Sequence, residues 1–165
     1  MSSLTASASS YSTAGSHEKS LQFLESKGIE NLEGFGRSVT RGEFAMYIVR
    51  VLELPNMVSA RTYADVPTSH PYYNEIQTAT AAGIIQGDTA TGKFHPSQPI
   101  SRIHMVRMLT NALDLLNISP KKTTKPNFKD TRGVSADYAN RITITYSLGI
   151  ITGNPSKNEF MPFKP

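Results

Sequence analysis

The stretch "GIIQGDTATGKFHPSQPISR", residues 83–102, decides the fold because a shorter version of it occurs again near the end of the chain. The second version is "GIITGNPSKNEFMPFKP", residues 149–165. The matches also continue upstream in register, and they pair Tyr72 with Tyr138, Ile76 with Ile142, Phe94 with Phe160, and Pro96 with Pro162. So many ordered matches indicate an internal repeat, which predicts copies of one small unit packed on each other.

A weaker third copy comes earlier in the chain. Its "VTRGEFAMYIVRVLEL", residues 39–54, matches "ISRIHMVRMLTNALDL", residues 100–115. We therefore divide the chain into a flexible Ser/Ala/Thr-rich linker at 1–16, repeat 1 at 17–55, repeat 2 at 63–116, a linker at 117–127 and repeat 3 at 128–165. Repeat 1 lacks the aromatic-x-Asp opening of the others, and repeat 3 ends before its second helix.

Each complete repeat predicts two helices, so we expect an all-α fold with loops that can carry isolated short β pairs. Gly83 and Gly149 stand where a first helix should end, since glycine takes a positive φ without a Cβ clash. Thr40 and Glu43 have the spacing of a capping box, and Ser101 is the corresponding cap of repeat 2. The predicted helices are 17–27, 41–54, 71–82, 102–116 and 135–148.

The apolar positions of these helices predict the core. One unit of this size cannot bury its apolar stripe alone, so neighbouring repeats must cover it. The expected core positions are Leu24, Ile29, Phe44, Ile48, Leu52, Ile76, Ile84, Phe94, Met105, Leu109, Leu113, Ile142, Ile150 and Phe160.

Composition excludes several classes of function. The chain has no cysteine, its four histidines lack metal-site spacing, and no nucleophile or phosphate-loop motif is present, so we predict no catalytic residue, metal or cofactor. No apolar run approaches the roughly 18 residues of a membrane span, so we expect no membrane insertion. The start "MSSLTASASSYSTAGS" has no basic head or apolar segment, so we expect no export signal in this chain. A net charge of +4 is compatible with an anionic partner or with an ordinary surface.

Four ordered motifs in repeat 2 resemble one family: "YADV" at 63–66, "GIIQG" at 83–87, "GKFHP" at 92–96 and "ISRIH" at 100–104. Repeat 3 has "FKDT", "GIITG" and "EFMPFKP". This order is similar to the S-layer homology repeat, which runs F-x-D-V, G-I-I-x-G, G-x-F-x-P and T-R-A-E. The resemblance implies a pseudo-three-fold assembly of helix-loop-helix repeats, with repeat 3 incomplete here.

The resemblance also implies a function. Such triplets are non-covalent anchors of the bacterial cell surface, in the cell wall or S-layer, and grooves between repeats bind secondary cell-wall polysaccharide that typically carries a pyruvate ketal on N-acetylmannosamine. Carried over by motif, the ligand-binding residues are Arg41 and Arg102, Asp65 and Asp130, and Gly87 and Gly153. The family usually has a tryptophan early in the first helix, whereas this chain has none and places Tyr72 and Tyr138 next to those positions. We expect both tyrosines to be ligand-binding residues in its place, because tyrosine can stack on a sugar face and also donate a hydrogen bond.

The chemistry of arginine fits this role, because its planar fork matches a carboxylate in two parallel hydrogen bonds. A helix N-terminus would add unpaired N–H groups beside Arg41 and Arg102. We expect Arg102→Ala to weaken polymer binding and leave the melting temperature nearly unchanged. The alternative is that both arginines pair with a nearby Asp or Glu and only hold the repeats together.

Other functions compete with the anchor. A protein-interaction or assembly module on the same fold, with decayed glycan grooves, is the alternative reading. Catalysis would have to lie in another domain of a larger enzyme. Nucleic acid is not expected as a partner, because the basic residues are not interleaved with aromatics. Self-association could fill the gap left by the missing helix of repeat 3, since a monomer rarely tolerates a large exposed apolar patch.

Overall fold

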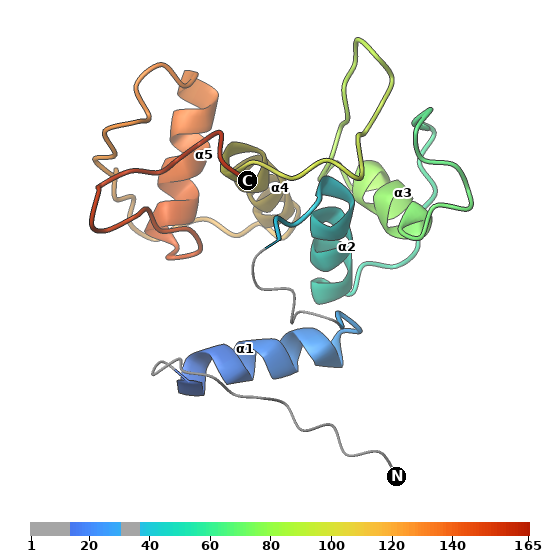
Figure 1. The fold of residues 1–165 in the computed structure, drawn as a ribbon, viewed down its shortest axis with the longest axis horizontal. Coiled ribbons are helices and arrows are strands. Elements are labelled where there is room, and N and C mark those ends of the chain that lie inside the picture. The colour runs from blue at the N-terminus through green and yellow to red at the C-terminus, as the bar shows by residue number, and fades with distance from the viewer. Residues whose placement is uncertain (1–13, 31–36) are drawn as a thin grey trace. The chain divides into compact units, whose positions relative to one another are not determined.

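The computed structural model describes residues 14–30 and 37–165, which form five helices. They are α1 (Ala14–Ser26), α2 (Arg41–Val51), α3 (Tyr73–Ala81), α4 (Arg102–Leu115) and α5 (Ala136–Ser147) (Figure 1). Within these two ranges no strand forms, and isolated β-bridges join Thr40 to Pro99 and Asn154 to Glu159. The all-α prediction is therefore confirmed, and every predicted helix is present with ends within three residues of those expected.

The chain divides into two compact units, Met1–Phe35 and Gly36–Pro165. The first contains α1, and the turn that follows this helix places Gly28 in the left-handed region, with a φ of +70°. The predicted 1–16 linker lies mostly outside the described residues, although Ala14–Ser16 belong to α1. Because α2 belongs to the second unit, the two helices assigned to repeat 1 fall in different units. The boundaries 17–55 stay a prediction.

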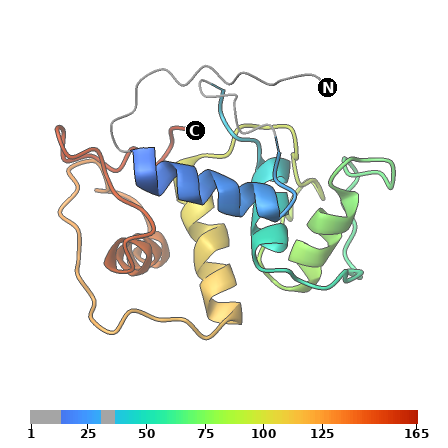
Figure 2. The ribbon, with the colours of Figure 1, turned by 90° about the horizontal axis from the view of Figure 1, so that it is seen from below.

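In the second unit the helices pack in pairs across the repeat boundaries. α2 of repeat 1 packs on α3 of repeat 2, and α4 of repeat 2 packs on α5 of repeat 3. Figure 2 shows both pairs, and α2 also contacts α4 between them. In both pairs, a helix assigned to one repeat is thus covered by a helix assigned to the next. A pseudo-three-fold arrangement stays a prediction.

The helix ends follow the sequence signals in most places. Thr40 Oγ1 accepts a bond from the backbone N of Glu43 at 3.2 Å, and Glu43 Oε2 accepts from the backbone N of Thr40 at 2.8 Å, so the capping box is confirmed. Gly83 and Gly149 end their helices at φ of +73° and +69°. Ser101 stands at the N-cap of α4, but its hydroxyl bonds the imidazole Nδ1 of His104 at 2.9 Å instead of a backbone N–H.

The core consists of two clusters in the second unit. The larger lies around α2 and α3 and reaches Met108 and Ala112 of α4, whereas the smaller joins Val106 of α4 to Ile142 and Phe160. α4 therefore has two buried faces, which a single apolar stripe does not describe. Among the predicted core positions, seven are buried: Ile29, Ile48, Ile76, Ile84, Phe94, Ile142 and Phe160. Six others are only half-buried: Leu24, Phe44, Leu52, Met105, Leu109 and Leu113.

Ile150 is a wrong core prediction, because 45% of its surface is exposed. Its counterpart Ile84 is buried in the larger cluster, and the side chain of Asn111 on α4 donates to the carbonyl oxygen of Ile84 at 3.0 Å. No helix follows α5 among the described residues to cover Ile150 in the same way. A helix that follows the glycine turn is thus what buries this position in repeat 2.

Candidate functional site

Each of the two matching loops is held by an aspartate from the start of its own repeat. The two carboxylate oxygens of Asp65 accept bonds from the backbone N atoms of Phe94 and His95, at 2.9 and 2.7 Å. Asp65, which the resemblance gives as a ligand-binding residue, thus bonds backbone N–H groups about thirty residues along the chain. The bonds hold the loop where His95 has a φ of +59°, which is unusual for a residue with a Cβ.

Repeat 3 has the same arrangement. Asp130 accepts bonds from the backbone N atoms of Phe160 and Met161 at 2.7 and 2.6 Å, and Met161 has a φ of +57°. The sequence match between the loops therefore reflects a shared carboxylate clamp on a left-handed residue.

The next contact joins the clamped loop to the second helix of the preceding repeat. Arg41 Nε donates to the carbonyl oxygen of Phe94 at 2.9 Å, and the guanidinium carbon lies 4.9 Å from the centre of the Phe94 ring. Arg102 Nε makes the same bond to the carbonyl oxygen of Phe160 at 2.8 Å, with 5.0 Å to the ring centre. Neither arginine forms an ion pair within the described residues, so the pairing with Asp or Glu that we considered is wrong. Both arginines instead hold a neighbouring backbone.

The helix N-termini are also occupied by the loops. In α2 the backbone N atoms of Arg41 and Gly42 donate to the carbonyl oxygens of Gln98 and Pro96, at 2.9 and 2.8 Å. In α4 the corresponding bonds run from Arg102 to Lys164 and from Ile103 to Pro162, both 2.9 Å. These four N–H groups, at the first two positions of each helix, are therefore already bonded and are not free for an anion.

The two arginines differ at the end of the guanidinium. Arg102 Nη2 donates to the carbonyl oxygen of Thr152 at 2.6 Å, so this side chain bridges two backbone segments of repeat 3. The Nη1 and Nη2 atoms of Arg41 have no hydrogen-bond partner within residues 14–30 and 37–165. Arg41 alone of this pair keeps both terminal nitrogens available for a bidentate contact.

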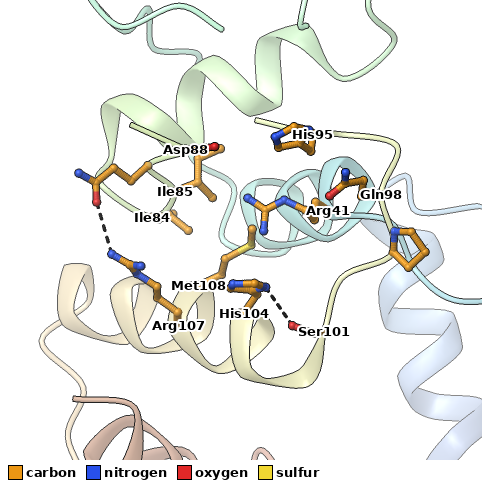
Figure 3. A pocket seen from close by; sticks show the side chains of 13 residues that line it. Arg41, Ile84, Ile85, Asp88, His95, Gln98, Ser101, His104, Arg107 and Met108 are labelled. Carbon is orange, nitrogen blue, oxygen red and sulfur yellow. Dashed lines mark hydrogen bonds between the residues drawn. The ribbon is translucent and has the colours of Figure 1, made fainter. Parts of the chain in front are cut away.

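Arg41 lines a pocket of about 410 Å³ in the second unit. Figure 3 shows Arg41 reaching into it from α2, while His104, Arg107 and Met108 reach into it from α4. We call this pocket the Arg41 groove, and its lining comprises Arg41, Ile84, Ile85, Gln86, Gly87, Asp88, His95, Gln98, Pro99, Ser101, His104, Arg107 and Met108.

The charges of the Arg41 groove favour an anion. Arg41 and Arg107 are the cations of its lining, and Arg107 Nη2 donates to Gln86 Oε1 at 3.3 Å. Asp88 is the carboxylate of the lining, but its oxygens already accept bonds from the backbone N of Ala90 at 2.8 Å and the hydroxyl of Thr91 at 2.7 Å. With two guanidinium groups and one carboxylate, the lining carries a net positive charge, which favours an anion.

Burial and neighbouring charge adjust the protonation of the groove. Burial lowers the pKa of Arg41 below its usual value, but the group stays charged near neutral pH. His104 is exposed as a whole residue, but partial desolvation of its ring, followed by the charges of Arg41 and Arg107, lowers its pKa below the usual 6.5. Near neutral pH the groove thus combines two charged arginines with a largely neutral imidazole.

The remaining predicted site residues have mainly structural contacts. Gly87 lines the groove, but a Cβ there would collide with the ring of Tyr63 and lie 2.9 Å from the carbonyl oxygen of Lys93. At Gly153 a Cβ would collide with the ring of Phe128. Packing of an aromatic ring therefore explains both glycines.

Neither predicted tyrosine lines the groove. Tyr72 is half-buried against the larger core cluster, and Tyr138 is half-buried on α5. Arg102, Asp130 and Gly153 also lie outside the groove lining. A second pocket of about 470 Å³ contains none of the predicted residues and is lined by Asn127, Phe128, Lys129, Arg132 and Asn158.

Two groove residues escaped the sequence prediction. They are His104, which stands at the position of Glu43 in the matching segment, and Arg107, which belongs to none of the motifs. Their three-residue spacing places them on one face of α4, which is the available sequence signal. That this face borders Arg41 depends on how α4 packs beside α2.

The described residues contain no group of three or more His, Asp or Glu side chains arranged to hold a metal ion. Within the same ranges, no helix combines the length and apolar character needed to cross a bilayer.

Comparison with known proteins places the repeats in a family. The model of the S-layer homology domain matches residues 62–106 and 127–165, which are predicted repeats 2 and 3, while repeat 1 lies outside the match. The chain is 36% identical over 131 residues to the surface-layer 125 kDa protein of Lysinibacillus sphaericus, covering 79% of this chain and 10% of that protein. It is 26% identical over 126 residues to the S-layer protein sap of Bacillus anthracis, covering 76% and 14%.

An enzyme is also among the relatives. The amylopullulanase of Thermoanaerobacterium thermosulfurigenes is 30% identical over 127 residues, which is 76% of this chain but only 7% of the enzyme. The chain thus spans between 7% and 14% of the length of these three relatives. Given the two matched repeats and their shared clamp of aspartate, loop and arginine, this chain belongs to the S-layer homology family.

Proposed function

We propose that this chain is a non-covalent anchoring module of the bacterial cell envelope, located outside the cell. Its ligand is an anionic secondary cell-wall polysaccharide that carries a pyruvate ketal, bound in the Arg41 groove. Two relatives are named as surface-layer proteins, which supports this location. The chain itself acts as a binding module and not as an enzyme.

One observation carries the proposal. Arg41 is held by its Nε on the carbonyl oxygen of Phe94, while Nη1 and Nη2 stay without a partner in the described part of the chain and line the groove. A guanidinium already fixed in place loses little conformational freedom on binding. The ketal carboxylate can then accept two parallel bonds from the terminal nitrogens.

The rest of the groove suits a sugar. Gln86 and Gln98 provide side-chain amides that can bond hydroxyl groups. Ile84, Ile85 and Met108 also line the groove, but at most 5% of each residue is exposed, so the polar side chains supply most of the contacts.

We assign Arg102 no direct contact with the ligand. Its Nε and Nη2 atoms both donate to backbone carbonyl oxygens, so Arg102 cannot bond a carboxylate through both terminal nitrogens as Arg41 can. We assign the principal contact to Arg41 and treat Asp65 and Gly87 as supports of its loop. Binding at Arg102, Asp130, Gly153, Tyr72 or Tyr138 is not part of this proposal.

The test is binding to wall sacculi that carry the polymer, compared before and after chemical removal of the pyruvate. We expect saturable binding that depends on pyruvate and is lost in Arg41→Ala. Arg41→Lys should also bind weakly, because one ammonium cannot bond both Phe94 and the ligand in the same way. Lys157→Ala, which removes one exposed charge far along the chain in repeat 3, is the matched control and should bind normally. Equal binding by Arg41→Ala and Lys157→Ala would reject the proposal.

The second candidate is a protein-interaction module on the same fold, including self-association. Large apolar side chains are exposed near the end of α4 and after α5, namely Leu115, Leu116, Ile118, Ile150 and Phe163. Sedimentation equilibrium tests self-association, since a concentration-dependent mass would support it. Pyruvate-independent retention on sacculi would favour a protein partner over the polysaccharide.

A further inference from the structure

We propose that His104 is a second anion-binding side chain of the Arg41 groove, and that it couples ligand binding to the uptake of a proton. This inference rests on the proposed function and adds a specificity-determining residue to it. Binding is then stronger in a mildly acidic environment than in an alkaline one.

The position of His104 supports a direct contact. It lies on the first turn of α4 and lines the same groove as Arg41 (Figure 3). The hydroxyl of Ser101 lies 2.9 Å from Nδ1 and fixes the ring. Nε2 makes no hydrogen bond within the described ranges, so a bound anion can accept a bond from it when the ring is protonated.

The surrounding charges come from three elements. Arg41 belongs to α2, Asp88 and His95 to the loop after α3, and Arg107 to α4. Asp88 is engaged by its own turn, and His95 Nδ1 faces the Asp65 carboxylate at 3.9 Å. A carboxylate of the ligand would therefore be the acceptor in this groove that is not already bonded to another part of the chain.

Helix α5 also packs on α4, but none of its residues lines the groove. Its charged pair, Asp137 and Arg141, is joined at 2.9 Å, and Arg141 also donates to Thr110 and Asn111 of α4. The two groove arginines are thus the main charges that oppose protonation of His104.

The sign of the coupling follows from these charges. In the free groove, burial and the two arginines depress the pKa of His104, so the ring is largely neutral near neutral pH. A carboxylate bound at Arg41 offsets the positive field and raises the pKa of the ring. Binding then takes up a proton at any pH between the two values, and affinity rises as the pH falls through that window.

The experiment measures the dissociation constant of a defined probe, the methyl glycoside of pyruvate-ketal N-acetylmannosamine, between about pH 5 and about pH 8. The ketal carboxylate stays ionised in this range, so it adds no pH dependence of its own to the measured affinity. For the wild-type chain we expect the affinity to fall with rising pH, by at most about tenfold per pH unit for one proton. His104→Asn should remove this slope and match the wild type at the alkaline end.

His95→Asn is the matched control, because His95 lines the same groove and asparagine tolerates the positive φ of that position. It should keep the wild-type slope. A parallel NMR titration of the His104 ring should show a higher pKa with the glycoside than without it. Binding that depends on Arg41 but has no slope, or an equal slope in His104→Asn, overturns this inference and leaves the proposed function intact. No binding of the glycoside by any variant, with an unchanged His104 titration, overturns both.

Discussion

The Nε atom of Arg41 donates to the carbonyl oxygen of Phe94 at 2.9 Å, across 53 residues of sequence. Arg102 repeats the contact with Phe160 across 58 residues. Each bond joins the first turn of a helix to a loop of the following repeat, and each loop is clamped by an aspartate of its own repeat. The repeats are therefore linked through polar backbone contacts as well as through apolar packing.

The first prediction concerns Arg102, for which the structure replaces our sequence expectation of an unchanged melting temperature. Arg102→Ala removes two charge-assisted bonds, to the carbonyl oxygens of Phe160 and Thr152. We expect a loss of about 1–3 kcal/mol in the free energy of unfolding, because those bonds join segments that are distant in sequence. Urea denaturation measures this loss, and Lys157→Ala serves as the exposed control. An unchanged midpoint combined with lost polymer binding would instead make Arg102 a ligand residue.

The second prediction concerns the aspartate clamp. Asn at position 65 offers one acceptor oxygen to the two N–H groups of Phe94 and His95, so Asp65→Asn leaves one N–H without its partner. The expected cost is about 1–3 kcal/mol. Asp137→Asn is the control, because the Asp137 side chain is 61% exposed and its ion pair is worth little. Equal denaturation midpoints for the two variants would contradict the clamp.

Asp65 also predicts a pH dependence. Burial raises the pKa of this carboxyl, but the bonds from Phe94 and His95 outweigh burial and hold the pKa below 3.8. The stabilising contribution is thus complete above the unfolded-state pKa and is lost as the pH falls through the lower folded-state pKa. The stability difference between the wild type and Asp65→Asn should shrink over that acidic range.

The third prediction compares two glycines with similar backbone angles. Gly87 and Gly92 have φ of +65° and +67°, so alanine costs roughly 1–2 kcal/mol in backbone strain at either position. Only at Gly87 would the new Cβ also meet the Tyr63 ring and the carbonyl oxygen of Lys93, whereas nothing lies within 4 Å at Gly92. Gly87→Ala should therefore lose roughly 1–3 kcal/mol more than Gly92→Ala in urea denaturation. Equal losses would show that the aromatic ring moves aside without cost.

The fourth prediction concerns the capping box of α2. The bond from the Arg37 guanidinium, together with bonds to Thr40, lowers the pKa of Glu43 from 4.5 to about 2. Glu43→Gln should cost about 1–2 kcal/mol near neutral pH, since it weakens the cap and removes the ion pair. The contribution is complete above pH 4.5 and is lost as the pH falls toward 2, so the two proteins should converge there. Asp114→Asn, exposed on α4, controls for loss of one negative charge. A difference that stays constant with pH would contradict a charged cap.

The sequence by itself determined the repeat, the all-α class, the positions of the helices and the capping box of α2. These features depend on local patterns: apolar spacing along a helix, a side-chain acceptor at its start and a glycine at its end. Such patterns act over a few residues and can be read without knowing what lies beside them. The family resemblance placed Arg41 in the candidate site for the same reason, since the motif around it is continuous in sequence.

Only the tertiary structure decided which arginine keeps both terminal guanidinium nitrogens without a hydrogen-bond partner, and which side chains line the same groove. Arg41 and Arg102 stand at matching motif positions. Arg102 Nη2 nevertheless donates to the carbonyl oxygen of Thr152, whereas neither terminal nitrogen of Arg41 makes such a bond within the described residues. His104 and Arg107 reach the groove because α4 packs beside α2, and Ile150 stays exposed because no described helix covers it. Each outcome depends on atoms that are distant in the chain and come within a few ångströms only through packing, so periodicity along the sequence cannot specify it.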